Sequence, residues 1–333
     1  MWLAYASLAA VCFGFRGILY QWTSQKSIDR NLLLLGVYLS GAFISGAAAL
    51  ALDKTWSEAV WTGTVMGLFS FIANAAMYKG FSVGKASLVA VFTALTPIIV
   101  VVVSYFRWGE HLNVKQTIAF AVIMAGIVMI RYSNDLSLRN LQGVQWALLA
   151  MATFGMTDLA SKQAMLWQAD TLPTLFVMYV TGATLFLGLW TSGRLRSRGT
   201  AVSLRREEAV AAETNPAAAE APAAVPGAHY NTEGSSFPVA ASVPAAFSQP
   251  AAWPIRRTLA WGALVGLTNI SGMIFILPAF QLGITGLVSA VVATNVLLIL
   301  LYARLFLKER WSLQESIGIL CAFAGVLGLR LLQ

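Results

Sequence analysis

The sequence carries little charge. Only 11% of its 333 residues are Asp, Glu, Lys or Arg, against roughly 25% in soluble globular domains. It also has only two histidines and two cysteines, and Cys12 and Cys321 both fall within apolar stretches. This composition predicts neither a disulfide framework nor a Cys- or His-based metal site, and we expect no cofactor. The scarcity of charge also argues against a soluble domain.

Long apolar runs dominate the sequence instead, since 58% of its residues are hydrophobic. A helix needs about 20 apolar residues to cross a bilayer. Runs such as Ile98 to Val103 do not alternate as the strands of a membrane barrel would, and helices satisfy their own backbone groups in lipid. We therefore predict an all-α integral membrane protein with ten transmembrane helices, at residues 2–22, 31–52, 58–79, 86–106, 114–132, 143–165, 172–191, 258–279, 284–306 and 313–331.

The sequence is internally doubled. Residues 63–131 align without a gap with residues 262–330 at a constant shift of 199, and a weaker match at a shift of 141 places Phe13 on Phe154. Each unit holds five apolar segments, and an odd number of crossings forces two copies into opposite orientations. We predict two inverted five-helix repeats, at 1–133 and 141–333.

A different composition interrupts the second repeat at residues 192–257. This segment begins with several arginines and then becomes rich in Ala and Pro. Such a stretch buries too little apolar surface to offset the entropy of ordering it, so we predict a disordered linker. It is either a tolerated insertion or a segment that binds a partner or regulates the protein.

The net charge of +8 arises from basic residues in the loops between the apolar segments. This pattern indicates membrane topology, so no nucleic-acid partner is expected. Odd-numbered loops hold more Lys and Arg than their repeat-related counterparts, where Lys162 is counted as the basic residue near loop six. The positive-inside rule then predicts that both termini lie outside and that the linker is cytoplasmic.

Several local motifs have structural explanations. Asn113 to Gln116 and Ser312 to Glu315 are spaced as capping boxes, and the repeat-related Glu110 and Glu309 precede them, in turns. A structural role for this glutamate fits its position better than a catalytic one. The glycine ridges 63–67 and 262–266 predict close helix contacts inside the chain.

One motif suggests an enzyme but fails on its context. Residues 80–84 (GFSVG) match the nucleophile-elbow pattern. The predicted topology places His111 across the membrane from Ser82, and the linker holds the other histidine, so no base would lie within reach. The repeat-related stretch also has Gln281 in place of the serine. We therefore predict that the protein is not an enzyme.

Two charged residues lie well inside predicted helices. Inserting Arg16 or Asp158 costs roughly 2.5–3.5 kcal/mol each, so each needs a partner or a function. Because their helices run in opposite directions, their Cα atoms are expected about 12 Å apart along the membrane normal. We expect them to bracket a central cavity, where Arg16 meets an anionic group and Asp158 binds a proton or a cationic group. The alternative is that they neutralise one another or bind backbone carbonyls.

Uncharged polar residues in other predicted helices complete a candidate cavity. Thr96 and Asn295 are repeat mates, and Pro97 is expected to break a helical hydrogen bond there, as is Pro278 in the eighth helix. Interrupted helices near the midplane are typical ligand sites of transporters. Alternatively, each polar group forms only a helix-packing hydrogen bond. The predicted substrate-binding residues are Arg16, Asn74, Tyr78, Thr96, Asp158, Asn269 and Asn295, with Thr93 nearby and Asp158 as the proton-coupling candidate.

The ten segments, the duplication and the stretch Leu95-Thr96-Pro97, followed by Gly109-Glu110 and Ala125-Gly126, resemble the drug/metabolite transporter superfamily of the EamA type. The resemblance implies a basket in which helices one, three, four, six, eight and nine line a central cavity with alternating access. Two features depart from the family: the second half lacks the proline of Thr96-Pro97, and the linker is long. Members are usually drawn with both termini in the cytoplasm, opposite to the charge count.

Together these features predict a secondary transporter in the plasma (inner) membrane that carries a small polar or anionic metabolite, such as an amino acid or organic ion. The resemblance favours export. Proton coupling through Asp158, exchange and facilitated diffusion all stay open, as does a homodimer. The alternative function is a non-transporting scaffold or sensor that acts through the linker.

Overall fold

The computed structural model describes residues 1–24, 26–83, 86–131, 143–214, 253–306 and 312–331, and within these ranges all regular structure is helical. Eight of these helical stretches are long and apolar enough to cross a membrane, and the apolar helix at Val114–Ile130 is shorter. The helix that carries Asp158 and Lys162 is not among them. These helices indicate a multi-pass membrane protein.

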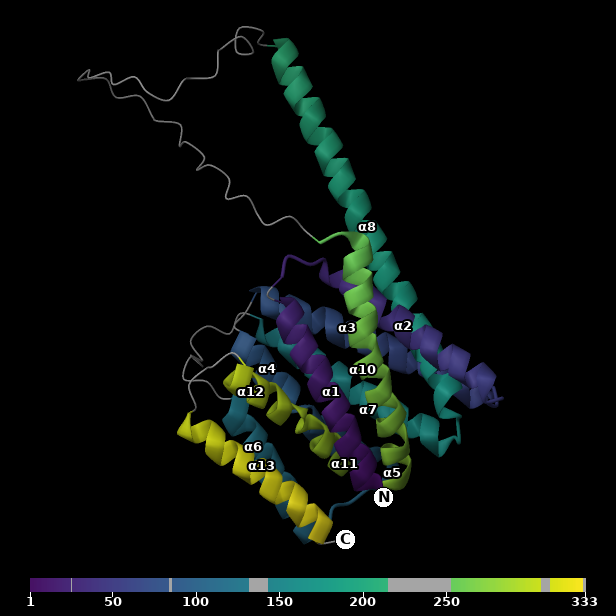
Figure 1. Ribbon diagram of the computed structural model, residues 1–333, viewed down its shortest axis with the longest axis vertical. Coiled ribbons are helices and arrows are strands. Elements are labelled where there is room, and N and C mark those ends of the chain that lie inside the picture. Colours follow the sequence, from purple (N-terminus) through teal and green to yellow (C-terminus); the bar gives the residue numbers. More distant parts are fainter. Residues whose placement is uncertain (25, 84–85, 132–142, 215–252, 307–311, 332–333) are drawn as a thin grey trace, which may run out of the picture. The chain divides into compact units, whose positions relative to one another are not determined.

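The helices follow one another along the chain as predicted, with two of the predicted segments divided (Figure 1). They are α1 (Trp2–Ser24), α2 (Arg30–Ala51), the short 3₁₀ turn η1 (Glu58–Trp61), α3 (Thr62–Val83), α4 (Ala86–Ala94), α5 (Thr96–Trp108), α6 (Val114–Arg131), α7 (Val144–Leu166), α8 (Thr171–Thr214), α10 (Ile255–Leu282), α11 (Thr285–Ala293), α12 (Asn295–Phe306) and α13 (Leu313–Leu331).

Two of the predicted helices are broken at related places. Leu95 separates α4 from α5, and Thr294, its counterpart at the shift of 199, separates α11 from α12. Pro97 lies in the first turn of α5, as its missing N–H favours. The second break has no proline, and there the Thr294 amide bonds to Val291 O at 3.1 Å, three residues back. The expected break at Pro97 is confirmed.

Pro278 lies inside a continuous helix, because α10 runs unbroken from Ile255 to Leu282. A proline has no backbone N–H, so one helical hydrogen bond is missing there, as expected. Proline breaks a helix only when the freed carbonyl and the ring cannot be accommodated, and α10 is not interrupted.

The helix ends confirm the predicted caps. Asn113 Oδ1 accepts from the Gln116 amide at 2.8 Å, and Gln116 Oε1 accepts from the Asn113 amide at 3.0 Å, which is the complete capping box. Glu315 Oε2 accepts from the Ser312 amide at 3.2 Å. At the start of α2, Asp29 accepts from the amides of Asn31 and Leu32.

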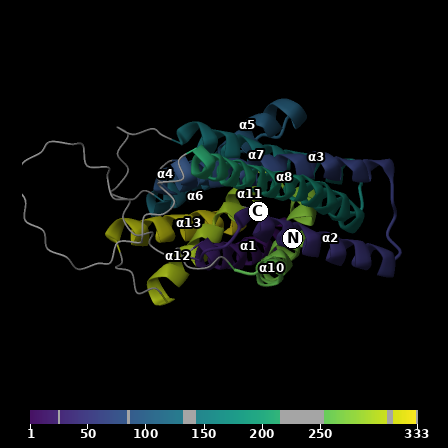
Figure 2. The same cartoon turned by 90° about the horizontal axis from the view of Figure 1, so that it is seen from above.

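Glycines let the helices approach backbone to backbone. A side chain at Gly63 or Gly67 would collide with the backbone of α8, and one at Gly262 or Gly266 with that of α2. Gly126 and Gly318 bring α6 and α13 together in the same way, and the two helices lie side by side in both views (Figures 1 and 2). The predicted glycine ridges are confirmed as contacts within one chain.

Helices of the first half of the sequence pack mainly on helices of the second half, and repeat-related helices make equivalent contacts. The helix α1 packs on α10, and α7, its counterpart at the shift of 141, packs on α3, the counterpart of α10. Likewise α1 contacts α12, and α7 contacts α5. The main contacts therefore join the first half of the chain to the second, and neither half is packed by itself.

The chain divides into two compact units: residues Met1–Leu187 with Trp253–Gln333, and residues Gly188–Ala252. The predicted disorder of residues 192–257 is wrong at both ends, because α8 continues to Thr214 and α10 starts at Ile255. Residues 204–213 consist mostly of Leu, Arg, Glu and Ala, which are strong helix formers, and the first proline of the segment is Pro216. Residues 215–252 lie outside the described part.

Gly262→Ala tests the close packing of α10 on α2. The added methyl would meet Leu33 O and Gly36 Cα, and we expect a loss of roughly 1–3 kcal/mol of stability from overpacking. Gly188→Ala is the matched control, because nothing lies within 4 Å of its Cβ position. That variant should be neutral or stabilised by up to about 1 kcal/mol through helix propensity. Thermal unfolding in detergent measures both, and equal melting temperatures would contradict the packing argument.

Asp170 joins two loops and predicts a pH effect. Its carboxylate accepts from Thr55 Oγ1 at 2.6 Å and Thr55 N at 2.8 Å, and Lys54 Nζ lies 3.9 Å away. The hydroxyl bond, then the amide bond and the ammonium, hold the pKa of Asp170 below its usual value. A lowered pKa stabilises the fold above the unfolded pKa of about 3.9 and loses this effect as pH falls through the folded pKa.

Asp170→Asn should therefore lower stability near neutral pH, by less than about 1 kcal/mol because the site is solvent-screened. The difference from the native protein should vanish in acid. Thermal unfolding across this pH range checks the prediction, and a difference independent of pH would contradict it.

Candidate functional site

A cavity of about 290 Å³ lies in the unit formed by residues 1–187 and 253–333. All six of the helices implied by the resemblance line it, as α1, α3, α4 with α5, α7, α10, and α11 with α12, and α2 and α8 contribute as well. Its polar lining residues are Arg16, Tyr20, Tyr38, Ser70, Asn74, Thr93, Thr96, Thr157, Asp158, Ser161, Asn269, Ser289 and Asn295.

Arg16 projects from α1 into this cavity. Its Nη1 donates to Asn269 Oδ1 at 2.6 Å, and its guanidinium carbon lies 4.5 Å from the centre of the Phe13 ring. Asn269 in turn donates to Tyr179 OH at 3.0 Å, so its orientation is set from α8. A guanidinium has five N–H donors, and this arrangement leaves most of them for a ligand.

Asp158 occupies the cavity from α7. Its Oδ2 accepts from Ser289 Oγ at 2.7 Å, and within the described part of the chain Oδ1 makes no hydrogen bond. No ion pair joins Asp158 to Arg16 among the described residues. The two opposite charges therefore line one cavity without neutralising one another directly.

The two helix breaks meet the same cavity. Ala94, Thr96 and Pro97 line it at one break, and Ala293, Asn295 and Val296 line it at the other. Thr96 Oγ1 donates to Thr93 O at 2.8 Å, which satisfies a carbonyl next to the break. The polar groups at both interruptions are thus near the space where a ligand would bind.

A tyrosine network closes the side of the cavity formed by α2 and α3. Tyr38 OH and Ser70 Oγ lie 2.6 Å apart, and Asn74 Nδ2 donates to Ser70 O at 2.8 Å and to Tyr38 OH at 3.4 Å. Asn74, a predicted site residue, is therefore partly engaged inside its own helix.

The structure brings six of the seven predicted site residues to one cavity, and Tyr78 lies in α3 with its side chain outside the described part. Sequence reasoning missed Tyr20, Tyr38, Ser70, Thr157, Ser161 and Ser289. Isolated Ser and Tyr residues are common in apolar helices, and only packing shows which of them face the cavity.

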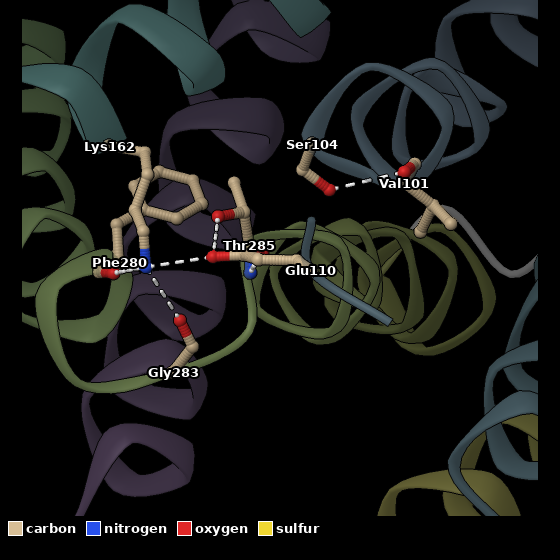
Figure 3. A network of polar contacts seen from close by, with 7 residues as sticks. All are labelled: Val101, Ser104, Glu110, Lys162, Phe280, Gly283 and Thr285. Atoms are coloured by element: carbon tan, nitrogen blue, oxygen red, sulfur yellow. Dashed lines mark hydrogen bonds and ion pairs between the residues drawn. The ribbon is translucent and has the colours of Figure 1, made fainter. Parts of the chain in front are cut away.

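A second polar network lies where α5, α7 and α10 end and α11 starts (Figure 3). The αL residue Gly109, with φ +67°, ends α5 and directs the chain so that Glu110 reaches the start of α11. Glu110 accepts from Thr285 N at 2.7 Å and from Thr285 Oγ1 at 3.0 Å, and caps that helix. The structural role predicted for Glu110 is confirmed, although it caps α11 rather than its own turn.

Lys162 completes this network. Its Nζ lies 3.0 Å from Glu110 Oε1 and donates to Phe280 O at 2.7 Å and Gly283 O at 3.1 Å. The side chain is 8% exposed and belongs to α7, within the predicted helix 143–165. Its partners, not topology, account for its presence.

Residues 1–132 match the model of the EamA-like transporter family, and the resemblance to the drug/metabolite transporter superfamily of the EamA type is confirmed. A solved structure titled only "Crystal structure of protein" superposes with a TM-score of 0.65 at 14% identity, covering 99% of this chain and 96% of that chain. At this identity the likeness shows the fold alone. No curated protein matches significantly.

Asn269→Ala tests the link between Arg16 and Tyr179. Removing the amide leaves two inward-facing groups without their partner, which should cost roughly 1–3 kcal/mol. Ser271→Ala is the control two residues along the same helix, since its exposed hydroxyl bonds only to Leu267 O, and it should change stability by less than about 0.5 kcal/mol. Thermal unfolding compares them, and equal losses would mean that the Arg16 network contributes nothing.

Proposed function

We propose that this chain, whose residues 1–132 belong to the EamA-like transporter family, is a secondary carrier of a small zwitterionic or anionic metabolite, of which α-amino acids are the best-fitting class. Arg16 would bind the carboxylate. Asp158 would bind the ammonium group, or a proton when the substrate has no cationic group. The proposed direction is export across the plasma (inner) membrane.

The observation that carries this proposal is the pair of unlike charges on one cavity. In a pair held only for structure, direct contact would offset part of the desolvation cost of the two charges. Arg16 and Asp158 instead bond to the neutral partners Asn269 and Ser289, and each keeps hydrogen-bonding capacity. A ligand with both charges would complete both groups at once, which favours an amino acid over a singly charged ion.

The volume and lining of the cavity support a small ligand. Pockets for drug-sized ligands measure roughly 300–1,000 Å³, and the cavity of about 290 Å³ lies just below this range. Its apolar lining includes Phe13, Phe154 and three methionines, Met77, Met178 and Met273. This lining suits an amino acid with an apolar side chain, because aromatic rings and thioethers adapt to such groups.

The proposed mechanism is alternating access between two inverted five-helix repeats, residues 1–133 and 141–333. The shift of 199, the breaks at Leu95 and Thr294 and the exchanged helix partners support this arrangement. We further propose ten membrane crossings, with the termini outside and residues 192–257 on the cytoplasmic side, from the bias of Lys and Arg between loops. A homodimer is compatible with this arrangement and is not required by it.

Uptake into proteoliposomes tests the function. An amino-acid and organic-anion panel would be compared with and without a pH gradient, for the native protein, Asp158→Asn and Arg16→Gln. Loss of a charge-assisted hydrogen bond of about 1.5–3 kcal/mol should weaken substrate binding by roughly 10- to 100-fold in Arg16→Gln. For an organic anion, gradient-driven accumulation should disappear in Asp158→Asn while exchange continues. For an amino acid, whose ammonium group Asp158 would bind, both accumulation and exchange should weaken.

Two outcomes would contradict the proposal. Equal flux in all three proteins would show that neither Arg16 nor Asp158 takes part in transport. No flux of any compound, together with loss of a cellular phenotype on deletion of residues 215–252, would favour the scaffold or sensor function instead. Ser271→Ala serves as the control variant, because its side chain is exposed and bonds only within its own helix.

A further inference from the structure

The polar network formed by Glu110, Lys162, Phe280, Gly283 and Thr285, here named the Glu110–Lys162 cluster, lies at one end of the helix bundle. Counting helix directions along the chain, the loops 52–57, 109–113, 167–170 and 283–284 all fall at this end, and α1 starts there (Figure 1). We call it end A and the opposite end, at loop 25–29, end B. The cluster joins the first half of the chain, through Glu110, to the second half.

The cluster connects elements that alternating access would separate. Glu110 belongs to the loop after α5 and Lys162 to α7. The other three residues follow one another through the last turn of α10, the α10–α11 connection and the start of α11. The glutamate and lysine side chains are 15% and 8% exposed, so opening end A would expose or unpair a nearly buried ion pair. Breaking one partner of such a pair is strongly unfavourable. Separating these elements at end A would therefore be opposed by the cluster.

The helices α7 and α11, which the cluster joins, are joined a second time at the cavity. Asp158 and Lys162 are one turn apart on α7, and Ser289 and Thr285 are one turn apart on α11. Asp158 bonds to Ser289 directly, while Lys162 reaches Thr285 through Glu110. A ligand that draws Asp158 away from Ser289 thus acts on a contact one helical turn from the cluster.

The sequence does not repeat this arrangement at end B. At the shift of 199, Glu110 and Thr285 correspond to Glu309 and Ala86, and at the shift of 141 Lys162 corresponds to Gln21. Glutamine forms no ion pair, and alanine supplies no hydroxyl. The residue types that close end A therefore have only one counterpart at end B, the glutamate.

We propose that Lys162 and Glu110 are the positioning residues that close end A of the carrier, and that their absence as a pair at end B makes the state closed at end A the preferred one. This inference rests on the proposed transport function. In this view Lys162 has no contact with substrate and acts through α11 and the α10–α11 turn.

Side-resolved thiol labelling tests the proposal. In a Cys12→Ser/Cys321→Ser background, Ala94→Cys places a reporter on the cavity wall, and a membrane-impermeant maleimide is applied from each side of oriented vesicles. Trp56→Cys, in an exposed loop at end A, identifies which side of the vesicle is end A. The experiment therefore assumes no topology.

Lys162→Gln should raise labelling of the reporter from end A by about tenfold or more, because loss of a buried charge partner shifts a two-state equilibrium at least this far. Lys162→Arg should label as the native protein does, and Thr285→Val, which removes one bond to Glu110, should lie between them. Lys54→Gln is the matched control, since it breaks a more exposed ion pair with Asp170 at the same end and should leave labelling unchanged.

A double exchange, Lys162→Gln with Gln21→Lys, keeps the net charge and should lower labelling from end B while raising it from end A. Equal end-A labelling in Lys162→Gln, Lys54→Gln and the native protein would overturn the proposal. So would labelling that rises equally from both sides with loss of a folded size-exclusion peak, in Thr285→Val as well as in Lys162→Gln, because that pattern marks a merely structural cluster.

The two proposals fail separately. Labelling reports access to the cavity and needs no transported substrate, so absent flux would remove the carrier function and leave this result standing. Normal flux with side-independent labelling would remove only the role of the Glu110–Lys162 cluster.

Discussion

Every charge placed inside an apolar helix bundle must be partnered, and the structure depends on how each one is. Lys162 is satisfied completely, by one carboxylate and two carbonyls at the ends of helices. Arg16 and Asp158 are satisfied only in part, each by one neutral side chain. The first arrangement holds helices together and the second leaves binding capacity in the cavity. The number of partners therefore distinguishes Lys162 from Arg16 and Asp158.

The short helices follow from the same constraint. A helix end inside a bilayer leaves N–H or C=O groups without partners, so an interruption is tolerated only where other groups satisfy them. Glu110 caps the start of α11, and threonine hydroxyls bond to carbonyls beside both breaks. The breaks therefore lie at polar positions, and these positions form the cavity wall. Helix interruption and the polar lining of the cavity are two results of one requirement for hydrogen bonds.

Glycine packing makes the exchange of partners between the halves of the chain possible. Close contacts at Gly63 and Gly262, and at Gly126 and Gly325, bring backbones together without bulky side chains between them. In lipid, the dispersion energy of such contacts takes the place of the hydrophobic effect that drives helix packing in water. Because the glycines occur at repeat-related positions, the same kind of contact forms twice, once from each half.

The sequence by itself determined the helical segments, the doubling, the glycine ridges and the residue types of the cavity, because these depend on composition, period and spacing. One break was predicted from the stretch Leu95-Thr96-Pro97, because Pro97 has no backbone N–H to donate. Only the tertiary structure decided the break at Thr294, the continuity of α10 through Pro278 and the pairing of Lys162 with Glu110, 52 residues earlier in the sequence. Each of these depends on which groups from distant segments reach an unsatisfied carbonyl, amide or charge, and that is settled by packing in three dimensions.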